Sequence, residues 1–371
     1  MSWNNIVGQE KTKLQIKNIF EKKNIHQAYL FIGKEGVGKD AIAIEFAKLL
    51  NCTEGNTEAC DKCFNCINIG KLQHPNLKLI FQMPTKNSEE NLEDETLSNT
   101  LVEEIRNELK IKSQNYYHKI SIIKANEILI DSIRQIIKEL SLSVFSNGKR
   151  IILISNADLM NEKSQNAFLR TLEEPPFNTT IILTTSSLSH IKETIQSRCQ
   201  KFYFDDLTSN EIENALIKFQ NINNDEAKII SHIAFGSYGN ALKLLHSDLN
   251  MMRKNAIDFL RLIASKSVSE VIYESEKIAK EFSRENLVNF FSLILLWFRD
   301  IFLHQNGFDV VNIDMIESIK KFCNKYKTLS IEKIFNLIEK HISLSNKNAY
   351  ILLSLSSFSL ELKQILKNAE E

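Results

Sequence analysis

Short apolar runs alternate with amphipathic segments through about the first two hundred residues of the chain. Buried strands are predicted for the apolar runs at residues 29–32, 77–81, 119–124, 151–154 and 180–184. Helices are predicted where apolar residues recur at helical spacing, at residues 11–20, 40–50, 131–140 and 162–172. Strands that alternate with helices in this way are typical of a parallel α/β sheet.

The pattern changes after Phe204, where runs typical of strands nearly vanish and the helical period continues to the C-terminus. A short helical unit is predicted for residues 206–247, and long helices with one apolar stripe follow, among them residues 287–303 and 350–366. This second part of the chain is therefore predicted to be all-α.

Residues 84–118 interrupt the α/β pattern with a polar, acid-rich stretch. Its first half has too few apolar residues to form a core of its own. We expect a surface excursion that contains one exposed helix.

Composition and charge indicate the number of domains and the expected location of the protein, but not its activity. The 371 residues are enough for two or three domains, and 46 basic residues balance 46 acidic ones, so no global field attracts nucleic acid or anionic lipid. The N-terminus lacks the features of a signal peptide, and the longest apolar stretch, residues 290–298, is about half a membrane span. We expect a cytoplasmic protein with no membrane association.

A phosphate-binding loop with one substitution follows the first strand. Its sequence is Gly33-Lys-Glu-Gly-Val-Gly-Lys39, which supplies Gly33, Gly36, Gly38 and Lys39 as candidate phosphate-binding residues. Asp40 stands where the pattern has the Ser or Thr whose hydroxyl ligates Mg²⁺. The strand at residues 151–154 likewise ends in Ser155 and Asn156 instead of acidic residues. The sequence predicts that the chain does not hydrolyse ATP; the loop either binds ATP or ADP without turnover or only joins strand to helix.

Four of the six cysteines form a cluster with the spacing C-x7-C-x2-C-x2-C, namely Cys52, Cys60, Cys63 and Cys66. Thiolates at this spacing converge on one tetrahedral ion when the loop folds back on itself, which favours a structural Zn²⁺ site. Four thiols without metal and two disulfides are the alternatives, and the disulfides would need an oxidising compartment. Four thiolates complete the coordination, so no catalytic role for the zinc is implied.

Arg198 is the third candidate, in the segment Ser197-Arg198-Cys199 that follows the last predicted strand. An arginine near the end of a nucleotide-binding sheet either neutralises a phosphate bound by a neighbouring subunit or is an ordinary solvated surface residue. Taken alone, the segment does not distinguish the two.

Several motifs together resemble the bacterial clamp-loader AAA+ family. They are Ile6-Val-Gly-Gln9, His26-Gln-Ala-Tyr-Leu-Phe-Ile-Gly33, the four cysteines, His74-Pro-Asn76, Asn166-Ala-Phe-Leu-Arg-Thr-Leu-Glu-Glu-Pro-Pro176 and Ser197-Arg-Cys199. Their order and spacing match over about residues 1–247. The resemblance implies an AAA+ nucleotide-binding-like domain at residues 1–205, with a zinc module (52–66) and the polar insert (84–118). It implies a helical lid at 206–248 and a helical collar domain at 249–371. We expect the Asn166–Pro176 motif to act mainly in packing, with a subunit contact through Arg170 or Glu173 as a second possibility.

Departures from the family pattern favour its non-motor, delta-prime branch. The motor subunits carry an arginine in the lid where this chain has Gly239, in addition to the groups missing at Asp40, Ser155 and Asn156. The resemblance implies that Arg198, flanked by Ser197 and Cys199, is an arginine finger that acts in trans.

The implied assembly is a hetero-pentamer of DNA polymerase III. Its other members are gamma/tau-type ATPase subunits and a delta subunit, and through them the sliding clamp and primer-template DNA are indirect partners. Two alternatives remain. One is an active gamma/tau-type ATPase, in which Asp158 would replace the missing strand carboxylates and Asp40 would reach the metal directly. The other is a zinc-stabilised scaffold or nucleic-acid adaptor.

Overall fold

The computed structural model describes residues 3–369, apart from residues 56, 85–93, 143–147, 247, 327 and 347–348. The chain divides into two compact units. The first comprises Met1–Ala215 and Gly236–Asn240, and the second comprises Leu216–Phe235 and Ala241–Glu371. The boundary after Ala215 falls inside α8 (Ser209–Gln220), and the boundary after Asn240 falls inside α10 (Tyr238–Leu245). The three-part division at residues 205 and 248 stays a prediction.

A five-stranded sheet forms the centre of the first unit, in the order β2-β3-β4-β1-β5. The strands are β1 (Ala28–Ile32), β2 (Leu77–Ile80), β3 (Arg150–Ile154), β4 (Thr179–Thr185) and β5 (Gln200–Tyr203). Every pairing is parallel, which confirms the predicted sheet type. Sequence reasoning missed β5, a short edge strand in which only Phe202 is buried.

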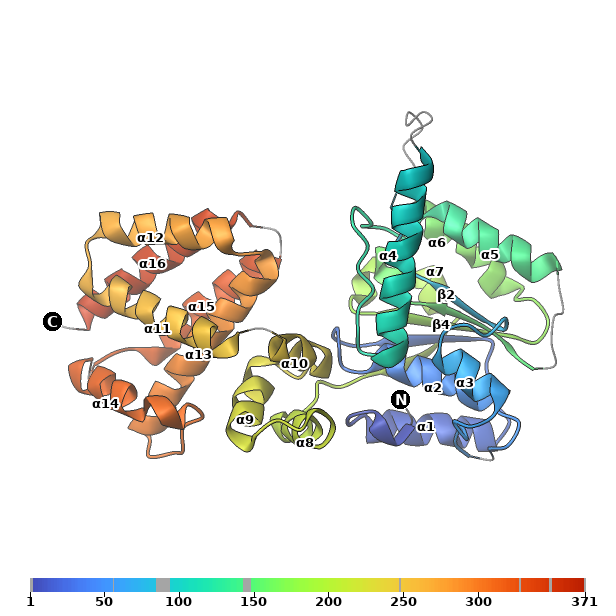
Figure 1. Ribbon diagram of the computed structural model, residues 1–371, viewed down its shortest axis with the longest axis horizontal. Helices are drawn as coiled ribbons and strands as arrows, with labels where there is room; N and C mark the ends of the chain where they lie inside the picture. Colours follow the sequence, from blue (N-terminus) through green and yellow to red (C-terminus); the bar gives the residue numbers. More distant parts are fainter. Residues whose placement is uncertain are drawn as a thin grey trace. The chain divides into compact units, whose positions relative to one another are not determined.

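Helices cover both faces of the sheet (Figure 1). One face carries α1 (Glu10–Glu21), α2 (Lys39–Asn51) and α3 (Phe64–Gly70), and the other carries α5 (Ile130–Leu142), α6 (Glu162–Glu173) and α7 (Glu193–Gln196). Alternate strand residues serve the two layers, because Tyr29 packs edge-on against Phe46 of α2, whereas Leu30 lies in the cluster with Phe168 of α6. A sheet buried on both faces explains why its strands read as continuous apolar runs.

The predicted strand at residues 119–124 is wrong. Ile120 and Ile122 are buried in a small cluster with Phe81, and the segment joins no sheet. The backbone N–H groups of Ser121 and Ile123 donate to carboxylates of Glu108 and Glu104 instead of to a neighbouring strand. The apolar spacing was real, but side chains of a helix satisfy the backbone groups that a ladder would have used.

The insert forms one long helix, α4 (Asp94–Gln114), as predicted, although the helix is not exposed along its whole length. Leu101, Ile105 and Leu109 pack on the cluster of Phe81 and Ile120, and Lys112 is buried. The first half of the insert, residues 85–93, lies outside the described residues. Figure 1 shows α4 running toward α2, where its last turn reaches the phosphate loop.

The second unit is helical throughout its described part. It contains α9 (Asn224–Ile233), α11 (Leu249–Ser265), α12 (Val268–Glu281), α13 (Arg284–Gln305), α14 (Ile316–Lys325), α15 (Ile331–Asn346) and α16 (Ile351–Asn368). Helix α13 packs against α9, α11, α14 and α15. Phe291 of α13 stacks edge-on against Phe358 of α16, at a ring separation of 5.0 Å. Four short 3-10 turns complete the described chain: Trp3–Asn5, Ala157–Leu159, Leu188–His190 and Ile313–Met315.

One stretch of α13, Asn286–Gln305, is long and apolar enough to cross a membrane by length and composition. It is 67% buried inside the fold. This burial is typical of the core helix of a folded domain, so the stretch is weak evidence for a membrane span.

Candidate functional site

The phosphate loop connects β1 to α2 in a conformation that needs glycine. Gly36 and Gly38 have φ angles of 76° and 109°, in the left-handed region, and Gly38 is the residue before the first turn of α2. Gly33 begins the loop, and a Cβ there would lie 2.7 Å from the carbonyl oxygen of Phe204. The sequence-predicted residues Gly33, Gly36, Gly38 and Lys39 therefore lie together.

Lys39 is buried and folded back on its own loop. Its Nζ donates to the carbonyl oxygens of Gly33 (2.6 Å) and Lys34 (2.7 Å). Burial lowers the pKa of Lys39, and the nearby carboxylates of Asp40 and Glu35 oppose this effect. The ammonium thus bonds to loop carbonyl oxygens.

Asp40 is the centre of a polar network at the carboxyl ends of three strands. Its Oδ2 accepts hydrogen bonds from Lys112 Nζ (2.6 Å) and Ser155 Oγ (2.7 Å), and its Oδ1 accepts one from Thr184 Oγ1 (2.8 Å). Burial opposes ionisation of this carboxyl, but the Lys112 ammonium and the two hydroxyls outweigh it and hold the pKa of Asp40 below its ordinary value. Asp40 and Ser155, two of the departures from the ATPase pattern, are bonded to each other.

Asn156 and Asp158 have partners within the same region. The backbone N–H of Asn156 donates to Thr184 Oγ1 (3.1 Å). Both carboxylate oxygens of Asp158 accept from Ser186, at 3.2 Å from its backbone nitrogen and 3.0 Å from its hydroxyl. The carboxylates that an active site would need for a metal are therefore already hydrogen-bonded.

A segment that follows α9, Gly236–Asn240, closes directly on the loop. The backbone N–H of Gly239 donates to the carbonyl oxygen of Gly36 (3.0 Å). A Cβ on Gly239 would lie 2.8 Å from the Gly36 Cα, and a Cβ on Gly36 would lie 2.2 Å from Ser237 Oγ. A side chain at position 239, where the motor subunits are expected to have arginine, would force these two segments apart.

The space left beside the loop is small. The loop and the end of the insert, residues 112–119, line a cavity of about 30 Å³. That volume holds roughly two water molecules at about 10–15 Å³ each.

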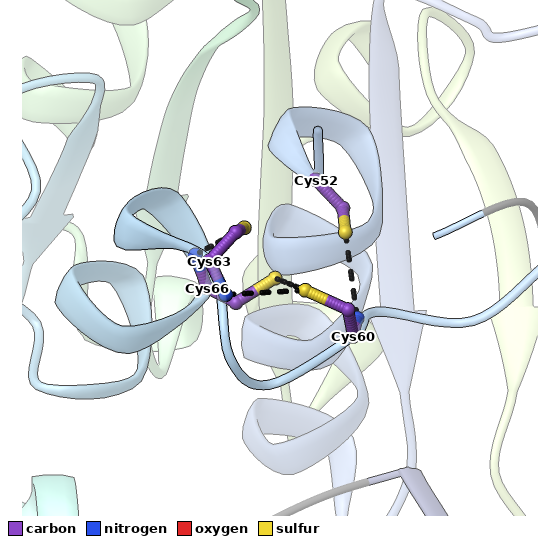
Figure 2. Close-up of side chains that lie close together, drawn as sticks. All are labelled: Cys52, Cys60, Cys63 and Cys66. Carbon is purple, nitrogen blue, oxygen red and sulfur yellow. Dashed lines mark hydrogen bonds between the residues drawn. The ribbon is translucent and has the colours of Figure 1, made fainter. Parts of the chain in front are cut away.

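The four cysteines Cys52, Cys60, Cys63 and Cys66 converge, as Figure 2 shows. Their sulfur atoms all lie within 4.8 Å of one another, and the Cys60 and Cys66 sulfurs are 3.9 Å apart. A tetrahedral zinc ion with bonds of about 2.3 Å separates its sulfur ligands by roughly 3.8 Å. None of the four forms a disulfide. The set fits a structural metal ion, with small adjustments.

Backbone amides donate to the sulfur atoms of Cys52 and Cys63, which favours the thiolate form of these two residues. Gly55 and Cys60 donate N–H groups to Cys52 Sγ, at 3.0 and 3.4 Å. Burial opposes ionisation of Cys63, but hydrogen bonds from the backbones of Thr53 and Cys66 lower its pKa to about 6. Helix α3 begins directly after Cys63 and packs on α2, so the cysteine module is joined to the helix that follows the phosphate loop.

Arg198 lies far from this loop along the sheet. It precedes β5, whose Gln200 pairs with Tyr29 at the start of β1 and whose Tyr203 pairs with Ile32 at its end. Roughly 10 Å of strand, at about 3.3 Å per residue, separates the two levels. Arg198 is therefore near the amino end of β1, whereas the phosphate loop follows the carboxyl end.

The Arg198 side chain is partly exposed and has two partners. It donates to the Thr194 carbonyl oxygen and to Glu173 Oε1, both at 2.8 Å. Its side chain is 37% exposed and that of Glu173 is 49% exposed. Ser197 donates to the same carbonyl oxygen, while Cys199 is buried and burial raises its pKa to about 12. Of the three residues, Arg198 presents the group able to contact an anion.

The motif at residues 166–176 builds α6 and supplies Glu173. Phe168 and Leu172 are buried in the core cluster, which confirms the predicted packing role. Arg170 is exposed on the same helix. A subunit contact through Arg170 or Glu173 stays a prediction.

Sequence reasoning missed the roles of Lys112 and Thr184. Thr184 ends a predicted strand, and its place opposite the loop follows from the parallel sheet. Lys112 lies in the polar insert, and no spacing in the chain links it to Asp40. The only available signal was Asp40 itself, because a carboxylate at a buried helix start requires a positive partner.

Known proteins resemble this chain in sequence. The family model for "DNA polymerase III, delta subunit" matches residues 8–208, more than half of the chain. The delta' subunit of DNA polymerase III from Bacillus subtilis is 26% identical over 325 residues, which cover 84% of this chain and 83% of that protein. The gamma subunit from Buchnera aphidicola subsp. Schizaphis graminum is 33% identical over 260 residues, 68% of this chain but only 60% of that protein.

A solved structure of a gamma subunit-related protein from Thermotoga maritima aligns with a TM-score of 0.43 at 15% identity, covering 97% of this chain and 99% of that one. This likeness is too low to add to the family match. The matched segment contains the phosphate loop, the cysteine cluster and Arg198. The chain therefore belongs to the clamp-loader AAA+ family of DNA polymerase III subunits.

Proposed function

We propose that the chain is a non-hydrolysing, delta-prime-like subunit of the clamp loader, which donates Arg198 to ATP held by a neighbouring ATPase subunit. The observation that carries the proposal is the position of Arg198, near the amino end of β1 and away from the chain's own phosphate loop. An arginine placed there is suited to a phosphate on another subunit. Its planar guanidinium would pair with two phosphate oxygens and neutralise charge that develops during hydrolysis.

The loop region supports the absence of hydrolysis. Asp40 is bonded to Lys112, Ser155 and Thr184. The groups that would have to bind Mg²⁺ and orient water are thus engaged with each other. Lys39 still stands at the phosphate-binding position, and bound ATP or ADP without turnover is compatible with the proposal.

An active gamma/tau-type ATPase is the second candidate, favoured by the 33% identity to a gamma subunit. It would require Asp158 to replace the missing strand carboxylates and Asp40 to bind the metal directly. Both carboxylates have protein hydrogen-bond partners, so this function would need the site to rearrange.

The proposed assembly follows from the family. The relatives, from different bacteria, are all named as gamma, tau or delta' subunits of DNA polymerase III, so the chain is proposed to join gamma/tau-type subunits and a delta subunit in a cytoplasmic hetero-pentamer. That assembly would load the sliding clamp on primer-template DNA. The lid and collar of such a subunit would correspond to residues 206–248 and 249–371.

A structural Zn²⁺ ion is proposed for the four cysteines. The ion would fix the loop of residues 52–66 and, through α3, brace α2. Cys52, Cys60, Cys63 and Cys66 would be its ligands, with no open position for chemistry.

The finger is tested by Arg198→Ala in the reconstituted complex. We expect normal assembly by gel filtration, but a fall in clamp- and DNA-stimulated ATP hydrolysis, because losing a finger costs the site it serves about 10³-fold or more in rate. Arg198→Lys should rescue poorly, since an ammonium lacks the planar fork. Arg134→Ala is the matched control, because Arg134 is an exposed arginine of the same unit with one acidic neighbour, Asp131. Normal hydrolysis by an intact Arg198→Ala complex would contradict the proposal.

A further inference from the structure

Lys112 is a buried lysine whose ammonium is hydrogen-bonded within the fold. Its side chain is 2% exposed, and its Nζ lies 2.6 Å from both Asp40 Oδ2 and the carbonyl oxygen of His118. It comes from the last turn of α4, which is 72 residues away from Asp40 along the chain. The end of the polar insert thus supplies a positive charge to the start of α2.

Asp40 needs that charge. Asp40 occupies the sequence position at which a phosphate loop ordinarily has the Ser or Thr whose hydroxyl binds Mg²⁺. Ser155 and Thr184 each donate a hydroxyl to it, but neither carries charge. A buried carboxylate without a counter-charge is strongly destabilising.

We propose that Lys112 is the internal counter-ion of Asp40 and takes the place of a divalent cation at this loop, so that the end of the insert closes the loop against Mg²⁺-nucleotide. This inference goes beyond the proposed function, because it assigns a role to the insert and concerns this chain alone. It stands or falls independently of Arg198.

Space at the loop agrees with closure. The cavity of about 30 Å³ is roughly a tenth of the smallest ordinary ligand pocket, about 300 Å³. Gly239 and Ser237 approach Gly36 so closely that neither glycine admits a Cβ. Tyr117, at the end of the insert, accepts a hydrogen bond from the Val7 N–H (2.8 Å) and packs against Tyr238 at a ring separation of 4.9 Å. These contacts hold the end of the insert in place.

Lys112→Met in the full chain tests the counter-ion. Lys119→Met is the matched control, because Lys119 lines the same cavity and pairs with Glu35 at 2.6 Å but is 38% exposed. At pH 8 we expect Lys112→Met to lower Tm by about 6 °C or more, since it leaves the Asp40 carboxylate, which is only 16% exposed, without a counter-charge. Lys119→Met should change Tm by at most about 2 °C.

The pH dependence separates charge pairing from packing. In the Lys112→Met chain, burial would raise the pKa of Asp40 above its unfolded value of about 3.9. The destabilisation should therefore be small near pH 4, grow as pH rises through the unfolded value, and be complete above the raised folded value. The Lys119→Met chain should show no such growth. The other ionisable groups around the cavity are common to both chains: Glu35, Lys39, His118 and Asp158.

The double variant Asp40→Asn, Lys112→Met decides the matter if Lys112→Met fails to fold. Removal of both charges should recover at least half of the lost Tm or restore folding. A double variant as unstable as the single one, or a Lys112→Met chain that matches Lys119→Met at every pH, would overturn the counter-ion.

Closure is tested with a fluorescent ATP analogue and Mg²⁺ added to the wild-type chain. We expect no saturable binding up to ~1 mM, the upper end of the usual range of enzyme KM values. Saturable binding that Lys39→Ala abolishes would overturn closure. These readouts use no partner subunit, so they are unaffected if the Arg198→Ala experiment contradicts the proposed function.

Discussion

Charged side chains near the two ends of β1 differ in their exposure to solvent. At the carboxyl end, Lys39, Asp40 and Lys112 are all buried or nearly so, and their charged groups are bonded to other groups of the same unit. At the amino end, Arg198 is partly exposed and has one exposed carboxylate partner, Glu173. The charges of Lys39, Asp40 and Lys112 stabilise the fold, whereas the charge of Arg198 remains accessible to a ligand.

The difference indicates how a nucleotide-binding fold changes its role. Once Asp40 replaces the metal-binding hydroxyl, the loop needs an internal cation, and the site becomes part of the core. A finger that acts on a neighbour must avoid this, because a strong internal partner would compete with the phosphate. The exposed pair of Arg198 and Glu173 contributes at most about 1 kcal/mol, so a doubly charged phosphate can displace it.

Zinc removal tests the support of α2, the helix that begins at the phosphate loop, and has the largest expected effect. Cys63→Ser should abolish binding of about one equivalent of zinc and lower the Tm of the first unit, because the module packs through α3 on α2. Structural zinc contributes several kcal/mol, and each kcal/mol lowers Tm by about 2–4 °C in a domain of this size. Metal analysis and calorimetry measure both quantities.

Cys323→Ser is the control for zinc removal, since Cys323 lies outside the cluster in α14. It should keep the zinc and most of the Tm. Protein prepared without chelators that contains no zinc would refute the site, and full zinc retention by Cys63→Ser would show that another ligand was misassigned.

Lys39→Ala tests whether the loop lysine is structural. It removes two hydrogen bonds to loop carbonyls, at Gly33 and Lys34, so a loss of about 1–3 kcal/mol in unfolding free energy is expected. ATP hydrolysis by the reconstituted complex should stay within about twofold of wild type, because this loop is not proposed to turn over ATP. The same change in a motor partner should reduce hydrolysis strongly. Hydrolysis by the isolated wild-type chain that disappears in Lys39→Ala would instead favour the active-ATPase function.

Much of the fold could be predicted because its signals are local. Buried strands such as β3 are continuous apolar runs, and α2 and α6 have clear apolar faces. The sequence-based predictions were wrong where contacts between segments far apart in the chain decide the local structure. Residues 119–124 have the apolar spacing of a strand, but α4 carboxylates hold their backbone, while β5 depends on pairing with β1 and has little apolar signal of its own.

The site could be predicted only as far as its residues are close in sequence. The cysteine cluster and the glycine loop can each be recognised from the spacing of their residues. In the structure the four cysteines lie together, and the loop glycines have the positive φ angles that such a loop needs. Lys112 could not be predicted, because its contact with Asp40 depends on how a helix of a polar insert docks. The close approach of Gly239 to Gly36 likewise follows from backbone packing that no motif encodes.

Glu173→Gln has the smallest expected effect and tests the accessible end. The amide keeps the shape of the side chain but removes the charge that faces Arg198 at 2.8 Å. Stability should change by less than about 1 kcal/mol, as for other exposed pairs. Stimulated ATP hydrolysis by the complex should stay equal to wild type or rise up to about fivefold, because releasing Arg198 from a pair worth at most about 1 kcal/mol can favour phosphate binding by no more than that factor.

Steady-state hydrolysis with clamp and DNA measures the effect, with Glu162→Gln as the control, since Glu162 is an exposed α6 carboxylate paired with Lys192 at 2.8 Å. A loss of hydrolysis as large as that of Arg198→Ala would mean that Glu173 itself contacts the neighbouring subunit or that the pair positions Arg198. The charged groups near the amino end of β1 would then depend on internal contacts, as those of the loop do.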